Sequence, residues 1–283
     1  MNALLIASLV LAEAARRRLL LTAAVITLAL VGLTSWGFHA LGTARDSHGH
    51  PIPHYAVMVS SSVLVIVMAF MFSLILSLSA AFLGALATGS EIENGTLLTI
   101  VPRPIRRIEI VFGKWLGNLV LIAGYAALIG SVEFLVVRLT TGYSPPHPYV
   151  AIAYLIAQSA LVLSLTMCLS VRLSPIAAAF ATIVLFGVAW VGGIAGTVGT
   201  ALNNVSLHQA ALLLSLLIPT DGIWRGAAFA LEPAAMVATV GSTRNFNPFV
   251  SGAPPTTAYL IWSVLWFAAV AGTGIALFRQ RDI

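Results

Sequence analysis

Long apolar runs restrict this chain more than any other feature. Residues 55–88 contain no Asp, Glu, Lys, Arg or His, and a helix needs only about 20 apolar residues to cross a bilayer. Further long runs cover residues 19–41, 108–140, 149–170, 175–198 and 257–278. Of 283 residues, 59% are hydrophobic and 8% are charged, about a third of the charge in a typical soluble domain. The sequence therefore predicts an all-α, polytopic membrane protein with six transmembrane helices and no separate globular domain.

The N-terminal segment, residues 3–18, differs from these runs. It is apolar up to Glu13 and ends in Arg16-Arg17-Arg18, whereas a signal peptide carries its basic residues before its apolar core. The part before Glu13 has only about a dozen residues, too few for a full span. We expect an interfacial helix on the cytoplasmic face, with its arginines at the level of the lipid phosphates. A buried first span is the alternative.

Basic residues indicate the orientation of the six predicted spans, which place both termini on one side. Ten of the fourteen fall on that side: Arg16, Arg17, Arg18, Arg103, Arg106, Arg107, Lys114, Arg172, Arg279 and Arg281. The other four are Arg45, Arg138, Arg225 and Arg244. The positive-inside rule thus predicts cytoplasmic termini in a plasma (inner) membrane. Because orientation explains the net charge of +5, we expect contact with membrane lipid and none with nucleic acid.

Residues 199–256 form a segment richer in Asn, Thr, Ser, Gly and Pro. Two apolar runs within it, residues 210–218 and 223–231, are too short to span a bilayer. They are joined at residues 219–222, Pro-Thr-Asp-Gly. We expect two helices that lie on the outer leaflet or dip into it.

Residues 91–117, between the second and third predicted spans, form the one charge-dense island in the middle of the chain. The island holds three acids and four bases: Glu91, Glu93, Glu109, Arg103, Arg106, Arg107 and Lys114. A segment with this charge must lie in water. Thr96 is a suitable helix cap, residues 97–101 supply an apolar face, and the Pro102/Pro104 pair ends the turn. The pattern predicts a short amphipathic helix at the membrane face.

This island resembles the loop between the second and third spans in the permease subunits of type-2 ABC exporters. That loop carries a pattern like Glu-x-Glu-x-Gly-Thr, a leucine-rich turn, Pro-x-x-Arg and Gly-Lys. The chain matches it at Glu91, Glu93, Gly95, Thr96, Pro104, Arg107, Gly113 and Lys114. It departs at Ile92, where the family often has a basic residue, and at Arg106, where it often has Ser or Thr.

The resemblance implies a coupling helix that contacts a separate ATP-binding subunit. Its partner-coupling residues would be Glu91, Glu93, Gly95, Thr96, Pro104, Arg107 and Lys114. It also implies export, a second permease chain that is either identical or a sister chain, and ATP and Mg held by the partner. The alternative for the island is an ordinary solvated loop.

No catalytic motif accompanies these features, so we expect neither an enzyme nor a cofactor in this chain. A phosphate-binding loop ending at Gly113-Lys114 would need Gly at position 108 and Ser or Thr at 115, which are Ile108 and Trp115. The rival function is a non-ABC membrane protein such as an ion-coupled secondary transporter, and an integral membrane enzyme comes third. No residue pattern identifies the substrate.

Two polar groups remain as candidate sites. Glu133 and Arg138 lie in the outer half of the third run, where an ionisable group is costly and points to a pathway or a partner. They are separated by about 140° around a helix and should not pair. His48, His50 and His54, with His39 nearby, could bind copper or zinc on the outer side, although a solvated turn is the simpler interpretation.

Small residues inside the runs have a structural explanation. Serines in the second and fourth runs usually serve helix packing in lipid. Gly192 and Gly196 have the spacing of a close helix contact. The single Cys168 excludes a disulfide within the chain, and we expect a buried thiol.

Overall fold

The computed structural model describes residues 3–16, 19–45, 50–93, 107–234 and 249–280. Within these residues the chain forms nine α-helices and no β-strand. The helices are α1 (Ala3–Arg16), α2 (Leu19–Gly42), α3 (His54–Glu93), α5 (Arg107–Thr141), α6 (Pro148–Ser170), α7 (Pro175–Ala201), α8 (Val205–Leu217), α9 (Thr220–Leu231) and α11 (Thr257–Arg279). The predicted all-helical, polytopic fold is confirmed.

The lengths of the helices match the bilayer. Among the described residues, α3, α5, α6, α7 and α11 are long and apolar enough to cross it, and the bent pair α8–α9 would add a sixth candidate if it were one span. The 24 residues of α2 reach about 36 Å, although the part described as a continuous apolar helix, Leu28–Gly42, is shorter. The 40 residues of α3 reach about 60 Å, twice the thickness of the hydrocarbon core. α3 therefore extends well beyond the hydrocarbon, as its apolar run predicts.

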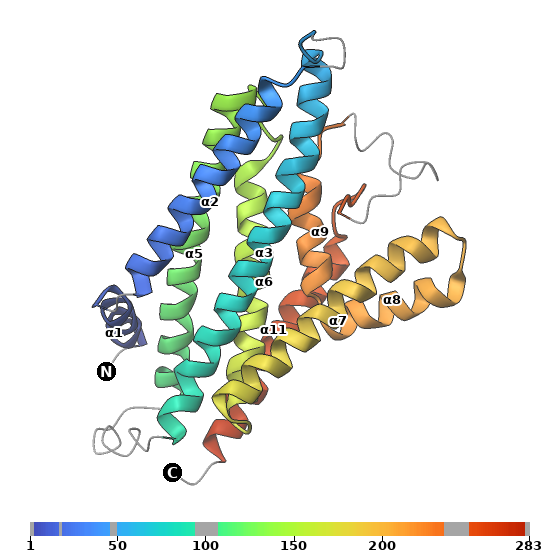
Figure 1. The fold of residues 1–283 in the computed structure, drawn as a ribbon. Helices are drawn as coiled ribbons and strands as arrows, with labels where there is room; N and C mark the ends of the chain where they lie inside the picture. Colours follow the sequence, from blue (N-terminus) through green and yellow to red (C-terminus); the bar gives the residue numbers. More distant parts are fainter. Residues whose placement is uncertain (1–2, 17–18, 46–49, 94–106, 235–248, 281–283) are drawn as a thin grey trace.

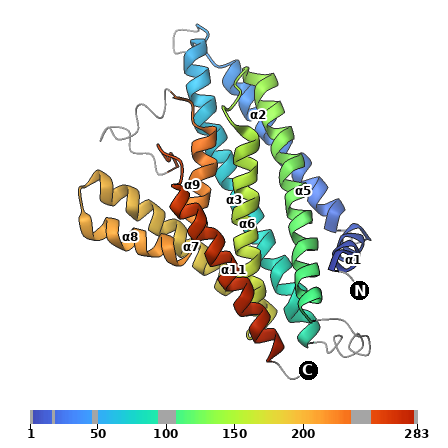
Figure 2. The same cartoon turned by 180° about the vertical axis from the view of Figure 1, so that it is seen from behind.

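Four helices, α2, α3, α5 and α6, form a bundle, and α7 and α8 project from it (Figure 1). The four bundle helices run side by side (Figures 1 and 2), and the best-buried core residues include Val65 and Ile66 of α3 and Leu163 of α6. α7 leans away from this bundle, and α8 folds back along it (Figure 1). At one end of the bundle α3 ends, α5 begins and α11 ends, and both chain termini lie near it (Figure 1).

α1 crosses α5 near that end of the bundle, and two glycines of α5 allow the contact. A Cβ on Gly113 would lie 2.7 Å from both the Ala3 carbonyl oxygen and the Cβ of Ile6. One turn later, a Cβ on Gly117 would lie 2.9 Å from the Cβ of Val10. Small residues at this spacing let two helix backbones approach closely in lipid. α1 is thus seated on a spanning helix.

Glycines also join α7 to α8. A Cβ on Gly192 would lie 2.8 Å from Leu214 Cδ1, and one on Gly196 would lie 3.0 Å from the Cβ of Ala211. The close helix contact predicted for these two glycines is confirmed, and its partner is α8.

The pair α8–α9 bends by 98° at its joint. α8 runs back beside α7 towards the bundle, and α9 then continues beside α3 and α6 (Figure 1). A bend of this size belongs to a broken span or to a re-entrant loop, and we call the pair α8–α9 the bent hairpin.

The last carbonyls of α8 and of α9 accept hydrogen bonds from other segments, which are α11 for α8 and the connection between α5 and α6 for α9. The last carbonyls of α8 accept bonds from α11: Ser215 from the Tyr259 hydroxyl at 3.1 Å, Leu216 from Trp262 Nε1 at 2.9 Å and Leu217 from Trp266 Nε1 at 2.8 Å. At the end of α9, the Leu231 carbonyl accepts from the Tyr143 hydroxyl, and the Ala230 carbonyl accepts from the His147 amide. Such terminal carbonyls lack intrahelical donors and are costly to leave unpaired in lipid.

Candidate functional site

The residues predicted to couple to a partner fall at the end of the bundle near the chain termini. Glu91 and Glu93 lie in the last turn of α3, and Arg107 begins α5. The fold thus brings the two ends of the predicted coupling segment to the same end of the bundle (Figure 1). The predicted coupling helix falls outside the described residues, as do three of the predicted coupling residues: Gly95, Thr96 and Pro104.

Lys114, the remaining predicted coupling residue, has a bond within the chain. Its Nζ donates to the Ala87 carbonyl at 2.9 Å, which ties the start of α5 to the last turns of α3. The preceding residue, Gly113, receives α1. The Gly-Lys pair of the resemblance therefore has packing roles here, and a contact of Lys114 with a partner stays a prediction.

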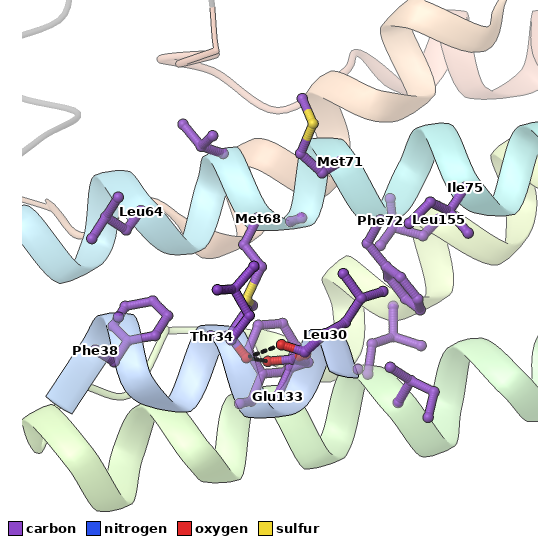
Figure 3. Close-up of a pocket in the computed structure, with 18 residues that line it drawn as sticks. Leu30, Thr34, Phe38, Leu64, Met68, Met71, Phe72, Ile75, Glu133 and Leu155 are labelled. Carbon is purple, nitrogen blue, oxygen red and sulfur yellow. Dashed lines mark hydrogen bonds between the residues drawn. The ribbon is translucent and has the colours of Figure 1, made fainter. Parts of the chain in front are cut away.

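A pocket of about 390 Å³ lies among α2, α3, α5 and α6 (Figure 3). Thr34 of α2 and Glu133 of α5 are its two polar residues, and every other lining residue is apolar or glycine. The volume lies within the usual range of small-molecule sites.

Glu133 lies on the pocket wall and has little access to solvent, with 7% of its surface exposed. The Thr34 hydroxyl donates to its Oε2 at 2.8 Å, as Figure 3 shows. No described Lys or Arg forms an ion pair with it. Arg138 is exposed and does not line the pocket. Of the two residues predicted for a pathway, the structure places Glu133 in a pocket and leaves Arg138 outside it.

Two polar contacts join α6 to its neighbours. Ser73 Oγ donates to Gln158 Oε1 at 2.8 Å between α3 and α6, and Trp115 Nε1 donates to Ser164 Oγ at 2.9 Å between α5 and α6. Other hydroxyls of these helices donate to carbonyls of their own helix, as Ser159 does. Ser61 Oγ and Ser77 Oγ are buried and have no hydrogen-bond partner among the described residues. The packing role expected of these serines is thus seen for Ser73 and Ser164.

An ion pair that was not predicted from the sequence lies inside the bent hairpin. Arg225 Nε donates to Asp221 Oδ2 at 2.7 Å, and its Nη2 donates to the Gly193 carbonyl of α7 at 2.6 Å. Gly193 has no side chain, and a Cβ there would collide with the Asp221 carboxylate. The signal that could have revealed the pair is the acid–base spacing of four residues in an apolar helix.

Glu232 closes the other end of α9, just beyond the hairpin. Its buried carboxylate accepts bonds from the backbone N–H of Ser251 and, at 3.1 Å, from that of Gly252. Burial raises the pKa of Glu232 above its ordinary value, and the two N–H donors and nearby Arg225 offset part of this effect. This carboxylate fastens the segment before α11 to the end of α9.

The histidines suggested for a metal site do not form one in the described structure. His50 and His54 are exposed, and His48 lies outside the described residues. No cluster of three or more His, Cys, Asp or Glu able to hold a metal ion occurs in the part of the chain that the structure describes.

Comparison with known proteins agrees with the architecture. The family model described as ABC-2 family transporter protein matches residues 5–283. A comparison with curated proteins returned no significant match. The matched region includes the island, the candidate spanning helices and the bent hairpin, so the match does not rest on one motif. The chain belongs to the ABC-2 family of transporter proteins.

Proposed function

We propose that this chain is the membrane-spanning subunit of an exporter powered by ATP hydrolysis on a separate ATP-binding subunit. A second permease chain, identical or a sister chain, would complete the pathway. The observation that carries the proposal is the family match across residues 5–283, because an ABC-2 membrane protein works with an ATP-binding subunit. ATP and Mg would be bound by that partner.

The contacts at the chain-terminal end of the bundle support a mechanical route from the partner into the membrane. A push on the segment between Glu93 and Arg107 would move the ends of α3 and α5 together, because Lys114 bonds the Ala87 carbonyl. α3 packs against α5, α6, α7 and α9, and α5 carries α1 and α2. Displacement of these two ends would therefore reach every other helix of the bundle.

Two acids on the partner-facing side are the proposed contact points. Charge-assisted hydrogen bonds at an interface contribute about 1.5 to 3 kcal/mol each. The double variant Glu91→Ala/Glu93→Ala should lose coupling between ATP hydrolysis and transport and keep membrane insertion. Arg106→Ala/Arg107→Ala is the control, because these arginines should act mainly on lipid headgroups. Parental transport by the glutamate variant, with its ATPase bound, would refute the coupling role.

The proposed orientation has both termini in the cytoplasm and the chain in the plasma (inner) membrane. It rests on the ten-to-four distribution of basic residues. In a Cys168→Ser background, Ser47→Cys and Pro145→Cys should react with an impermeant thiol reagent from outside intact cells, and Ile105→Cys should not. Labelling of Ile105→Cys from outside would reverse the orientation.

An ion-coupled transporter is the second candidate, and the buried Glu133 is the observation that favours it. A proton- or sodium-driven protein would stop transporting when an ionophore collapses the gradient. The proposed ABC permease would instead stop when ATP is removed and continue after the ionophore. Transport in sealed vesicles under these two conditions separates the candidates.

A further inference from the structure

We propose that the pocket among α2, α3, α5 and α6 binds a lipophilic amine that enters from the membrane between α2 and α3. The proposal names a ligand class that the family match does not supply. It rests on the proposed function only in treating the bound amine as a transported substrate.

The first observation is an acid without a cationic partner. Glu133 lies eight residues before the end of α5, about 12 Å along the helix and within its apolar part. A buried carboxylate is costly unless it is paired and hydrogen-bonded. Its Oε2 accepts from Thr34, and its Oε1 has no hydrogen bond within the described residues. An ammonium group in the pocket would supply the missing charge and donors.

The other buried acids of the described structure make Glu133 an exception. Asp221 is paired with Arg225, and Glu232 accepts two backbone N–H groups. Each of these acids has partners from its own chain that account for its burial. Glu133 has one neutral hydroxyl, so the described part of the chain offers its carboxylate no cation.

The second observation is the apolar remainder of the pocket. Met68 lies beside Thr34 and Glu133, as Figure 3 shows, and Met71 is a second methionine of the lining, together with aliphatic and aromatic side chains. Methionine side chains adapt to ligands of different shape. One acid inside an otherwise apolar wall is complementary to a ligand with one basic group on an apolar body.

The third observation is the position of the mouth. The floor residues Ile129 of α5 and Leu155 of α6 are 6% and 2% exposed, whereas Leu33 of α2 and Leu64 and Met71 of α3 are 62%, 44% and 47% exposed. α2 packs mainly against α5 and touches α3 little. The pocket therefore opens between α2 and α3, on the apolar side surface of the bundle. A lipophilic ligand would reach it from the hydrocarbon without crossing water.

The test uses the full chain in lipid nanodiscs at neutral pH and two photoreactive probes. One is a diazirine-bearing dodecylamine, and the other is the alcohol with the same chain, which partitions into lipid but carries no charge. We expect saturable labelling of residues 30–38 and 64–75 by the amine, with an affinity about tenfold or more above that of the alcohol. Glu133→Gln keeps the size and an acceptor for Thr34, and it should remove this preference.

A glycine pair tests the location independently of the charge. Gly37 lines the pocket, Gly32 of the same helix does not, and neither would bring a Cβ within 4 Å of another atom. Gly37→Leu should reduce labelling by both probes, and Gly32→Leu should leave it unchanged. Equal labelling by amine and alcohol in the parent chain, or an amine preference that survives Glu133→Gln, would overturn the proposal. Unaltered labelling of Gly37→Leu would place the ligand elsewhere.

This test can fail without the proposed function failing. A permease that binds its ATPase but shows no amine preference would contradict the ligand class alone. A chain that binds the amine but no ATPase would contradict the proposed function alone.

Discussion

Asp221 and Glu133 are both acids buried among apolar helices, but their surroundings differ. Asp221 lies at the start of α9, where Arg225 bonds it at 2.7 Å and links it to the Gly193 carbonyl of α7. Glu133 faces a pocket of about 390 Å³ and accepts one bond from Thr34. Asp221 is enclosed by groups that hold it in place, whereas Glu133 borders an open pocket.

This difference separates a structural role from a functional one. Removing one member of a buried ion pair leaves an uncompensated charge, so the loss appears as instability. Removing Glu133, which has no cationic partner among the described residues, should cost little stability and should change what the pocket binds. A buried acid in a membrane protein therefore indicates function only when no group of the protein pairs with it.

The largest effect should come from breaking the ion pair. Asp221→Ala should lower the free energy of unfolding by about 3 kcal/mol, near the low end for a buried pair because 24% of the Arg225 side chain is exposed. Denaturant or thermal unfolding of the purified chain in nanodiscs measures this loss. If Asp221→Ala lowered the free energy of unfolding no more than Glu133→Gln does, the two acids would not differ in their structural role.

The next effect concerns the contact that accommodates Asp221. Gly193→Ala introduces a Cβ into the position of the Asp221 carboxylate, and overpacking of this kind costs about 1 to 3 kcal/mol. Gly187→Ala in the same helix is the matched control, since its Cβ would meet nothing within 4 Å. The control should be neutral or slightly stabilising, because Ala favours a helix over Gly. Equal stability of the two variants would contradict the close contact.

A smaller effect is expected where α1 is seated on α5. Gly113→Ala collides with Ala3 and Ile6, but α1 packs on little besides α5 and can move away, so we expect a loss of about 1 kcal/mol. Gly124→Ala on α5 has open space and is the control. Exposure of Ile6→Cys to a thiol reagent, in the Cys168→Ser background, should rise only with Gly113→Ala. No rise would mean that α1 is held by other contacts.

The smallest change in stability should belong to Glu133→Gln. Because one neutral hydrogen bond from Thr34 remains possible, the free energy of unfolding should change by less than about 1 kcal/mol. Unfolding measured beside Asp221→Ala gives the comparison directly. A loss as large as that of Asp221→Ala would show that Glu133 is a structural residue.

Much of the fold could be predicted from hydropathy and charge. Uninterrupted apolar runs fix where spans lie, since a helix in lipid must satisfy its own backbone. The apolar run of residues 55–88 became the long helix α3, and the short runs around Asp221 became two helices that bend by 98° at their joint. The spacing of Gly113 and Gly117 could also have indicated the seat of α1, because it is the same small-residue pattern that was used for Gly192 and Gly196.

The pocket could not be predicted in the same way. It depends on the tilt and rotation of four helices, which hydropathy does not determine. Glu133 was recognised as costly in lipid, but its neighbour Thr34 lies on another helix and 99 residues away in sequence. The bonds from Tyr259, Trp262 and Trp266 to the end of α8 likewise join segments far apart in the chain.

The most direct test of an ATP-driven permease is purification of the tagged full chain from its native membranes in mild detergent, with ATPase assay and mass spectrometry of the complex. We expect a stoichiometric partner that carries a phosphate-binding loop, and ATP hydrolysis that disappears when the lysine of that loop is replaced. Recovery of a folded chain without any nucleotide-binding partner, and without ATP hydrolysis, would contradict the proposed function.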